Sequence, residues 1–266
     1  MSVFERLANE KASEYAYRYL KKNIIELEFA PNSRICEADI AKELGLSRTP
    51  VREALLELVK NKLVVVYPQK GSFVSKIDYN LVEESRFVRL VLEKAIIDIV
   101  CDKPDDKFID RLEINIRNQK YYLDKEDKTN LMQLDNEFHK ILFEMANKLQ
   151  THELVESISG HFDRLRNLSI NTIKDIKTVS DHEKIFLAIK SCDSFKAKEL
   201  MEIHLSRHKF EEKILRENAP VIFLPITIAL ILNIFFIVMI DIKVINSHFE
   251  MYAYSSLEFF GFVWVG

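Results

Sequence analysis

The chain has 266 residues, of which 48% are hydrophobic and 30% are charged, with a formal net charge of −3. This length suits one large domain or two ordinary ones, with enough apolar surface for a real core, and the charge does not by itself indicate a nucleic-acid binder. Three distant cysteines, Cys36, Cys101 and Cys192, exclude a paired disulfide framework and indicate reduced thiols in a cytoplasmic protein. Only five glycines and six prolines favour long helices over many short strands.

The N-terminal part of the chain predicts three helices. Apolar residues recur at helical spacing over residues 4–28. A second helix is expected over residues 37–44, followed by a turn at Gly45. The third helix is expected over residues 50–61, with Thr49 as its cap.

Two β-rich runs follow these helices. Residues 63–68 and 72–77 flank Gly71, and this arrangement is typical of a small hairpin. Three helices and a hairpin together predict a winged helix-turn-helix domain over residues 8–76.

From residue 79 onward the sequence shows only helical periodicity. The helices expected there cover residues 79–101, 105–124, 127–147, 151–174, 180–191 and 194–217. Short loops between them predict an antiparallel, all-helical bundle over residues 80–218, so the fold as a whole is expected to be mainly α.

The tail, residues 219–266, differs from the rest of the chain. Residues 221–240 carry no charge and are numerous enough to cross a bilayer. One interpretation is an inner-membrane anchor, which flanking basic residues would orient with the remainder of the chain in the cytoplasm. The alternative is an accident of the reading frame. Packing of the tail onto the bundle is disfavoured, because it would expose a large apolar patch.

The third predicted helix carries a candidate DNA-reading surface. Arg48 and Arg52 are four residues apart and therefore share one side of the helix. Arginine can fork onto guanine or clamp a phosphate, and the short side chains of Ser47 and Thr49 can bond phosphates or base edges. Taken alone, the two arginines would more often form a solvated helix face.

The hairpin offers further contacts to DNA. Lys70 and Gly71 at its tip can place a cation and bare backbone against the neighbouring groove. Arg34, before the second helix, can reach a phosphate.

Three strings in this region, RICEADIAKELGLS, SRTPVREAL and LVVVYPQKGSFV, closely resemble the DNA-binding domain of the GntR family of bacterial regulators. The resemblance covers roughly residues 8–76 and implies that Arg48, Thr49, Arg52 and Gly71 contact operator DNA. Asp39 stands where some relatives place an arginine that touches DNA, so the operator preference is expected to differ.

Four residues in the helical part suit a metal ion. Asp135 and His139 are four apart and project from one helix face, while His182 opens the helix HEKIFLAI and His204 lies on the helix after it. One carboxylate and three imidazoles suit zinc, nickel or manganese. The alternative is ordinary packing or solvation, which is how we interpret the remaining histidines. These are His152, His161, His208 and His248.

Residues 80–215 resemble the FCD effector domain of the FadR-like branch of GntR regulators. The resemblance is carried by RLVLEKAIIDIV, LDNEFHKIL and DHEKIFLAIKSCDSFKAKELMEIHL. It implies that the four residues hold a divalent metal, which anchors a small organic or sugar acid. Arg89 matches a family arginine that can face this pocket, and Arg166 is a second candidate for binding the carboxylate.

We therefore expect a ligand-responsive transcriptional regulator that binds double-stranded operator DNA as a homodimer in the cytoplasm. One alternative is a membrane-tethered regulator that uses residues 221–240. The other is a metal-dependent hydrolase, since such a site could activate water. We identify no general base beside the metal ligands, and so expect that the chain is not an enzyme.

Overall fold

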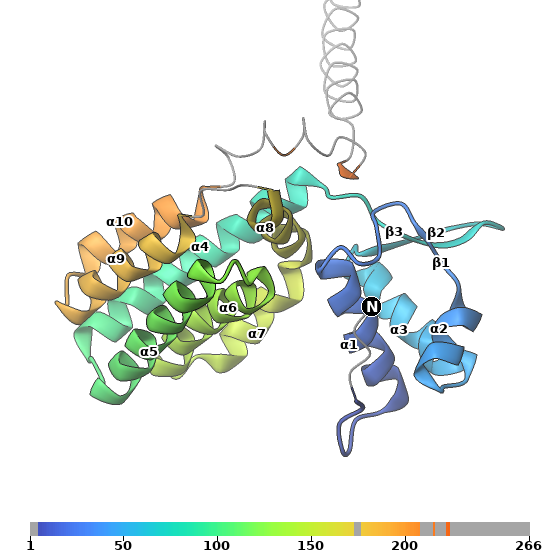
Figure 1. Cartoon of the computed structure of the whole chain (residues 1–266), viewed down its shortest axis with the longest axis horizontal. Helices are drawn as coiled ribbons and strands as arrows, with labels where there is room; N and C mark the ends of the chain where they lie inside the picture. The colour runs from blue at the N-terminus through green and yellow to red at the C-terminus, as the bar shows by residue number, and fades with distance from the viewer. Residues whose placement is uncertain (1–4, 173–176, 208–214, 216–221, 224–266) are drawn as a thin grey trace, which may run out of the picture. The chain divides into compact units, whose positions relative to one another are not determined.

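The computed structural model describes residues 5–172, 177–207, 215 and 222–223. These residues form ten helices and three short strands (Figure 1), which confirms the mainly helical fold. Residues Met1–Phe223 form one compact unit. The remaining unit, Leu224–Gly266, lies outside the described residues.

The N-terminal region contains three helices and a three-stranded antiparallel sheet. Its elements are α1 (Ala12–Ile25), β1 (Arg34–Ile35), α2 (Glu37–Leu44), α3 (Arg48–Lys60), β2 (Val64–Tyr67) and β3 (Gly71–Val74). The strand order is β1-β3-β2, with Phe73 of β3 opposite Arg34 on one side and Val65 on the other. The sequence predicted the β2–β3 hairpin but missed β1, because a two-residue strand is too short to show alternation.

Two helix boundaries differ from the prediction. Helix α1 begins at Ala12 rather than near residue 4, since Asn9 has a φ of 110° and the Glu14 carboxylate accepts from the Lys11 backbone N–H at the true start. Helix α3 begins at Arg48, so Ser47 rather than Thr49 is its N-cap residue. Helix α2 has the predicted bounds and ends on Gly45 at a φ of 65°.

The core of the N-terminal region lies where α1 packs against α3. Tyr19, Leu20 and Leu58 are fully buried there, and Val74 of β3 joins them. One face of α3 is buried against this core, and the residues on its opposite face are exposed. Burial of the first face therefore determines which face of α3 is available for binding.

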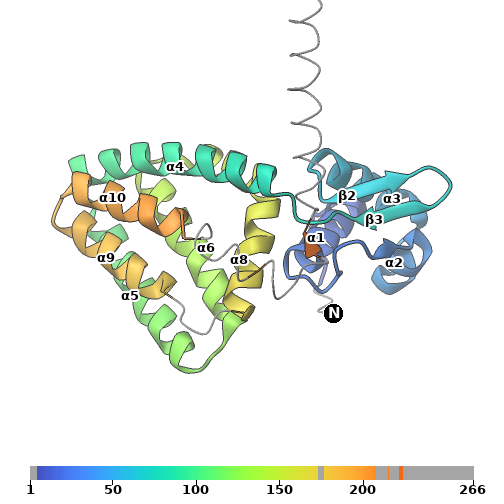
Figure 2. The ribbon, with the colours of Figure 1, turned by 90° about the horizontal axis from the view of Figure 1, so that it is seen from above.

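Within the described residues, seven helices form the bundle (Figures 1 and 2). They are α4 (Tyr79–Asp102), α5 (Asp106–Asp124), α6 (Lys128–Met145), α7 (Leu149–Ile158), α8 (Gly160–Thr172), α9 (Thr178–Lys190) and α10 (Ser194–Leu205). Helix α5 packs on α6 and α9, while α4 packs on α6, α8 and α10. The long helix expected over residues 151–174 is two helices, and the helix expected to run to residue 217 ends at Leu205.

The break between α7 and α8 lies at Ser159 and Gly160. Ser159 ends α7, and its hydroxyl donates to the Val155 carbonyl at 2.7 Å. Gly160 begins α8 with its Cα against Leu63, so close that an added Cβ would lie 2.9 Å from a leucine methyl carbon. A side chain at this position would collide with Leu63, which is itself buried.

Helix α8 is hydrogen-bonded to the main chain of the N-terminal region. His161 Nε2 lies 3.0 Å from the Lys62 carbonyl, and Nδ1 accepts from the Asp78 backbone N–H at 3.1 Å. Arg164 is fully buried and donates to the Ser75 carbonyl at 2.7 Å. Asn167 donates to the Ile25 carbonyl at 3.1 Å. One face of α8 therefore docks on backbone atoms of the preceding region.

The apolar segment of residues 221–240 lies outside the described residues except for Ile222 and Phe223. Phe223 is buried in the bundle core and pairs with Ile77 in an isolated parallel bridge. Among the helices of the described ranges, none combines the length and the apolar character that a membrane span requires.

His161 makes the stability of the protein sensitive to acid. Burial, together with the nearby Arg164 charge, lowers the pKa of His161 from 6.5 to about 4. Below pH 6.5, His161 becomes protonated in the unfolded chain but stays neutral in the folded chain. The free energy of unfolding therefore decreases as the pH falls from about 6.5 to 4. Between pH 7 and pH 5, we expect wild type to lose about 2 kcal/mol more than His161→Gln in urea unfolding. Equal losses in the two proteins would show that His161 is not held neutral.

Candidate functional site

Helix α3 presents Arg48, Thr49 and Arg52 on its exposed side, directly after the exposed Ser47. The Arg52 guanidinium bonds Glu37 at the start of α2, with Nη2 2.9 Å from Oε2. Both groups remain in contact with solvent, where such an ion pair contributes little and can be exchanged for another anion. The surface therefore offers two guanidinium groups, one of which is held against the neighbouring helix.

The strands bring two further cationic side chains, Lys70 and Arg34, to the turn between β2 and β3. Lys70 is exposed in this turn, and Gly71 follows it with a φ of 97°. Arg34 of β1 reaches the same place, since its Nε lies 3.6 Å from where a Cβ on Gly71 would be. A side chain at Gly71 would be strained and would crowd Arg34, so the bare backbone leaves room for a close approach.

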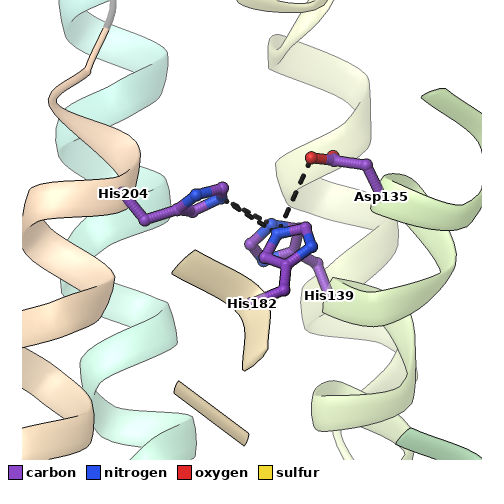
Figure 3. A group of neighbouring side chains, drawn as sticks. All are labelled: Asp135, His139, His182 and His204. Atoms are coloured by element: carbon purple, nitrogen blue, oxygen red, sulfur yellow. Dashed lines mark hydrogen bonds and ion pairs between the residues drawn. The ribbon is translucent and has the colours of Figure 1, made fainter. Parts of the chain in front are cut away.

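Four side chains that could ligate a metal ion converge inside the bundle (Figure 3). Helix α6 contributes Asp135 and His139 one turn apart, α9 contributes His182, and α10 contributes His204. Their nearest ligand atoms all lie within 4.8 Å of one another. His182 lies one turn into α9, which begins at Thr178, two residues before the start that the sequence predicted. The structure thus places all four predicted ligands in one cluster.

The inner nitrogens of the histidines have a spacing that suits a shared cation. His204 Nε2 is 3.2 Å from His139 Nε2 and 3.2 Å from His182 Nε2. Two nitrogens bound about 2.1 Å from one ion lie roughly 3.0 to 3.4 Å apart at octahedral or tetrahedral angles. Asp135 Oδ1 is 3.7 Å from His182 Nε2 and adds an oxygen ligand. This donor set fits zinc, nickel or manganese.

Burial keeps these histidines in the form that binds metals. Asp135, His139 and His182 are at most 2% exposed. Loss of solvent lowers the pKa of His139, His182 and His204 below the usual value for histidine. The imidazoles are therefore neutral at physiological pH, as coordination requires.

Three residues that the sequence analysis did not identify face the outer nitrogens of the histidines. Glu93, on α4, is 2.7 Å from His139 Nδ1, and Gln119, on α5, is 2.9 Å from His182 Nδ1. Asp181 Oδ2 lies 3.8 Å from His204 Nδ1. The signal available in the sequence was weak, because each is a single polar residue on the buried stripe of its helix. Glu93 and Asp181 lie in strings that resemble the FCD domain, but nothing in those strings pairs them with a particular histidine.

Two arginines lie beside the cluster. Arg89 Nε donates to Glu93 Oε1 at 2.6 Å, and both side chains are buried. Arg166 forms ion pairs with Asp135 and with Asp163, the latter at 3.0 Å. Both guanidinium carbons lie over the Phe162 ring, at 5.6 Å for Arg89 and 5.8 Å for Arg166. Both predicted arginines therefore contact the surroundings of the cluster.

A cleft of about 850 Å³ adjoins the cluster. Its lining includes Arg89, His139 and Arg166 from the bundle, as well as Lys21 from α1. A smaller cavity of about 50 Å³ reaches Asp135 and His204, and Arg166 lines both spaces. The cleft is large enough for a small-molecule ligand and combines cationic groups with a potential metal site.

The chain matches two family models. Residues 12–74 match "Bacterial regulatory proteins, gntR family", and residues 84–207 match "FCD domain". A transcriptional regulator from an unstable DNA locus of Streptomyces ambofaciens is 31% identical, over 78% of this chain and 87% of the relative. The transcriptional repressor RspR of Escherichia coli K12 is 26% identical, over 74% of this chain and 86% of the relative.

Solved structures of this fold are also similar. Escherichia coli McbR/YncC aligns with a TM-score of 0.66 at 18% identity, covering 78% of this chain and 98% of that one. A GntR regulator from Rhodococcus sp. RHA1 aligns with a TM-score of 0.64 at 23% identity, covering 76% and 97%. At these identities the likeness shows the shared fold.

Proposed function

This chain is a bacterial GntR-family transcriptional regulator with an FCD domain, and we propose that it is a homodimer whose operator binding responds to a small carboxylate effector held beside a divalent metal ion. The observation that carries the proposal is the buried cluster of Asp135, His139, His182 and His204 next to a cleft with two arginines. It combines the ligands for a cation with the groups that neutralise an anion.

On the DNA side, helix α3 would enter the major groove. Its exposed Arg48 and Arg52 would meet base edges or phosphates, while Ser47 and Thr49 would bond the backbone nearby. Arg34, Lys70 and Gly71 would contact the flanking groove. A homodimer would place two such helices on the half-sites of a pseudo-palindrome.

On the ligand side, Asp135, His139, His182 and His204 would hold the metal ion. A bound divalent cation supplies Lewis-acidic positions for a carboxylate oxygen of the effector. Arg89 and Arg166 would neutralise the same carboxylate or a second acidic group by paired hydrogen bonds. The effector would act on DNA binding by favouring one arrangement of the two α3 helices of the dimer over another.

The alternatives have less support. The relatives are transcriptional regulators rather than enzymes, which agrees with the prediction that this chain is not an enzyme. None of the helices in the described ranges is suited to span a membrane, and a tether is not part of the proposal.

Arg48→Ala and Arg52→Ala test the DNA-reading surface. Each should weaken binding to a duplex selected from a randomised pool by about 1–3 kcal/mol, because each removes a guanidinium from the groove. Fluorescence anisotropy at fixed moderate salt measures the change. Lys60→Ala, at the far end of α3, is the control and should bind like wild type. Unchanged affinity in both arginine variants would mean that α3 does not read the operator.

The double substitution His139→Ala with His204→Ala tests the metal centre. It removes two of the four ligands, and we expect less than a tenth of the wild-type metal content after loading with zinc and desalting. Elemental analysis measures the content, and His152→Ala, a buried histidine outside the cluster, is the control. Equal metal in the double variant and wild type would exclude this ligand set.

A further inference from the structure

The outer nitrogens of two cluster histidines face fixed oxygen atoms. Glu93 Oε2 lies 2.7 Å from His139 Nδ1, and Gln119 Oε1 lies 2.9 Å from His182 Nδ1. We propose that Glu93 and Gln119 are positioning residues that fix the Nδ1–H tautomers of these histidines and thereby turn both Nε2 lone pairs toward the shared centre. This inference rests on the proposed function and extends it to the residues that prepare the metal site.

The orientation of Gln119 follows from a chain of hydrogen bonds that starts at the backbone. The Leu134 carbonyl can only accept, so the Asn115 group 3.1 Å from it is the amide NH2. Asn115 Oδ1 then accepts from Gln119 Nε2 at 2.6 Å, which leaves Gln119 Oε1 facing His182. An oxygen that only accepts requires a proton on His182 Nδ1. The main chain of α6 thus determines the tautomer of a histidine on α9.

Glu93 fixes His139 more directly. A carboxylate only accepts, so the proton of neutral His139 lies on Nδ1. The other oxygen of Glu93 accepts from Arg89 Nε at 2.6 Å. With one oxygen for each donor, Glu93 cannot turn away from His139 without leaving the buried Arg89 guanidinium without that bond.

The consequence for the cluster is a shortage of protons at its centre. His139 Nε2 and His182 Nε2 both lie 3.2 Å from His204 Nε2. With both lone pairs turned inward, His204 can offer one proton to one of them at most. At least one buried lone pair then lacks a donor among these three rings, and a cation between the rings would satisfy all of them.

The tautomers can be read in the metal-free protein by long-range 1H–15N NMR of the full chain labelled on histidine, with assignments from single histidine substitutions. We expect protonated Nδ1 and unprotonated Nε2 for His139 and His182. A proton on Nε2 of either ring in the metal-free wild type would overturn the proposal for that ring.

Two variants test whether Glu93 and Gln119 determine the tautomers of His139 and His182. Gln119→Met keeps the length of the side chain but removes the acceptor for His182. Glu93→Gln leaves one oxygen for two donors, so its NH2 group must face either His139 or Arg89. We expect the Nε2–H tautomer to appear at His182 in the first variant and at His139 in the second. Zinc affinity, measured by competition with a chelator, should fall about 10- to 100-fold in each.

The controls carry the same substitutions at exposed positions, Gln150→Met on α7 and Glu84→Gln on α4. Both should keep wild-type tautomers and zinc affinity. Variants that keep both properties within twofold of their controls would overturn the proposal. If wild type has the expected tautomers but binds no zinc, nickel or manganese, the metal part of the proposed function fails, whereas the positioning role of Glu93 and Gln119 is supported.

Discussion

Burial of three neutral imidazoles at one point is the constraint on which the architecture of the bundle depends. Each ring has two nitrogens, and inside a packed core each nitrogen needs a partner. The inner nitrogens face one another, so the outer ones must find acceptors on other helices. Glu93 on α4 and Gln119 on α5 supply two of them, which ties these helices to α6 and α9 through polar contacts as well as apolar packing. A change in any of these helices therefore alters the geometry of the cluster.

Ion pairs connect the cluster of Asp135 and the three histidines with the two arginines that line the cleft. Asp135 is paired with Arg166, while Glu93 is shared between His139 and Arg89. Both arginines thus already have carboxylate partners within the protein. An anion entering the cleft competes with those partners, and a cation in the cluster competes with Arg166 for Asp135. If the proposed metal ion and effector bind here, a metal ion in the cluster would therefore change the free energy of binding an anion in the cleft, as linkage between neighbouring charged sites requires.

Much of this arrangement could be predicted from the sequence, and the remainder could not for physical reasons. Much of the N-terminal region was predictable because turn residues and alternating apolar runs occur at short spacing, as the bounds of α2 and its end at Gly45 show. The cluster of Asp135, His139, His182 and His204 was predictable because these residues occur in strings that resemble the FCD domain. Glu93 and Gln119 were not, because their role depends on contacts 46 and 63 residues away in sequence. The division of residues 151–174 into two helices was also missed, since it arises where Gly160 meets Leu63.

The docking of α8 on main-chain atoms has an evolutionary consequence. His161, Arg164 and Asn167 grip the carbonyl groups of Lys62, Ser75 and Ile25, which every residue type would present in the same conformation. If α3 reads the operator as proposed, substitutions on its exposed face leave these carbonyls unchanged. Related regulators can therefore come to recognise different DNA sequences while keeping the same connection to the bundle. An N-terminal region exchanged between paralogues would also keep most of that connection.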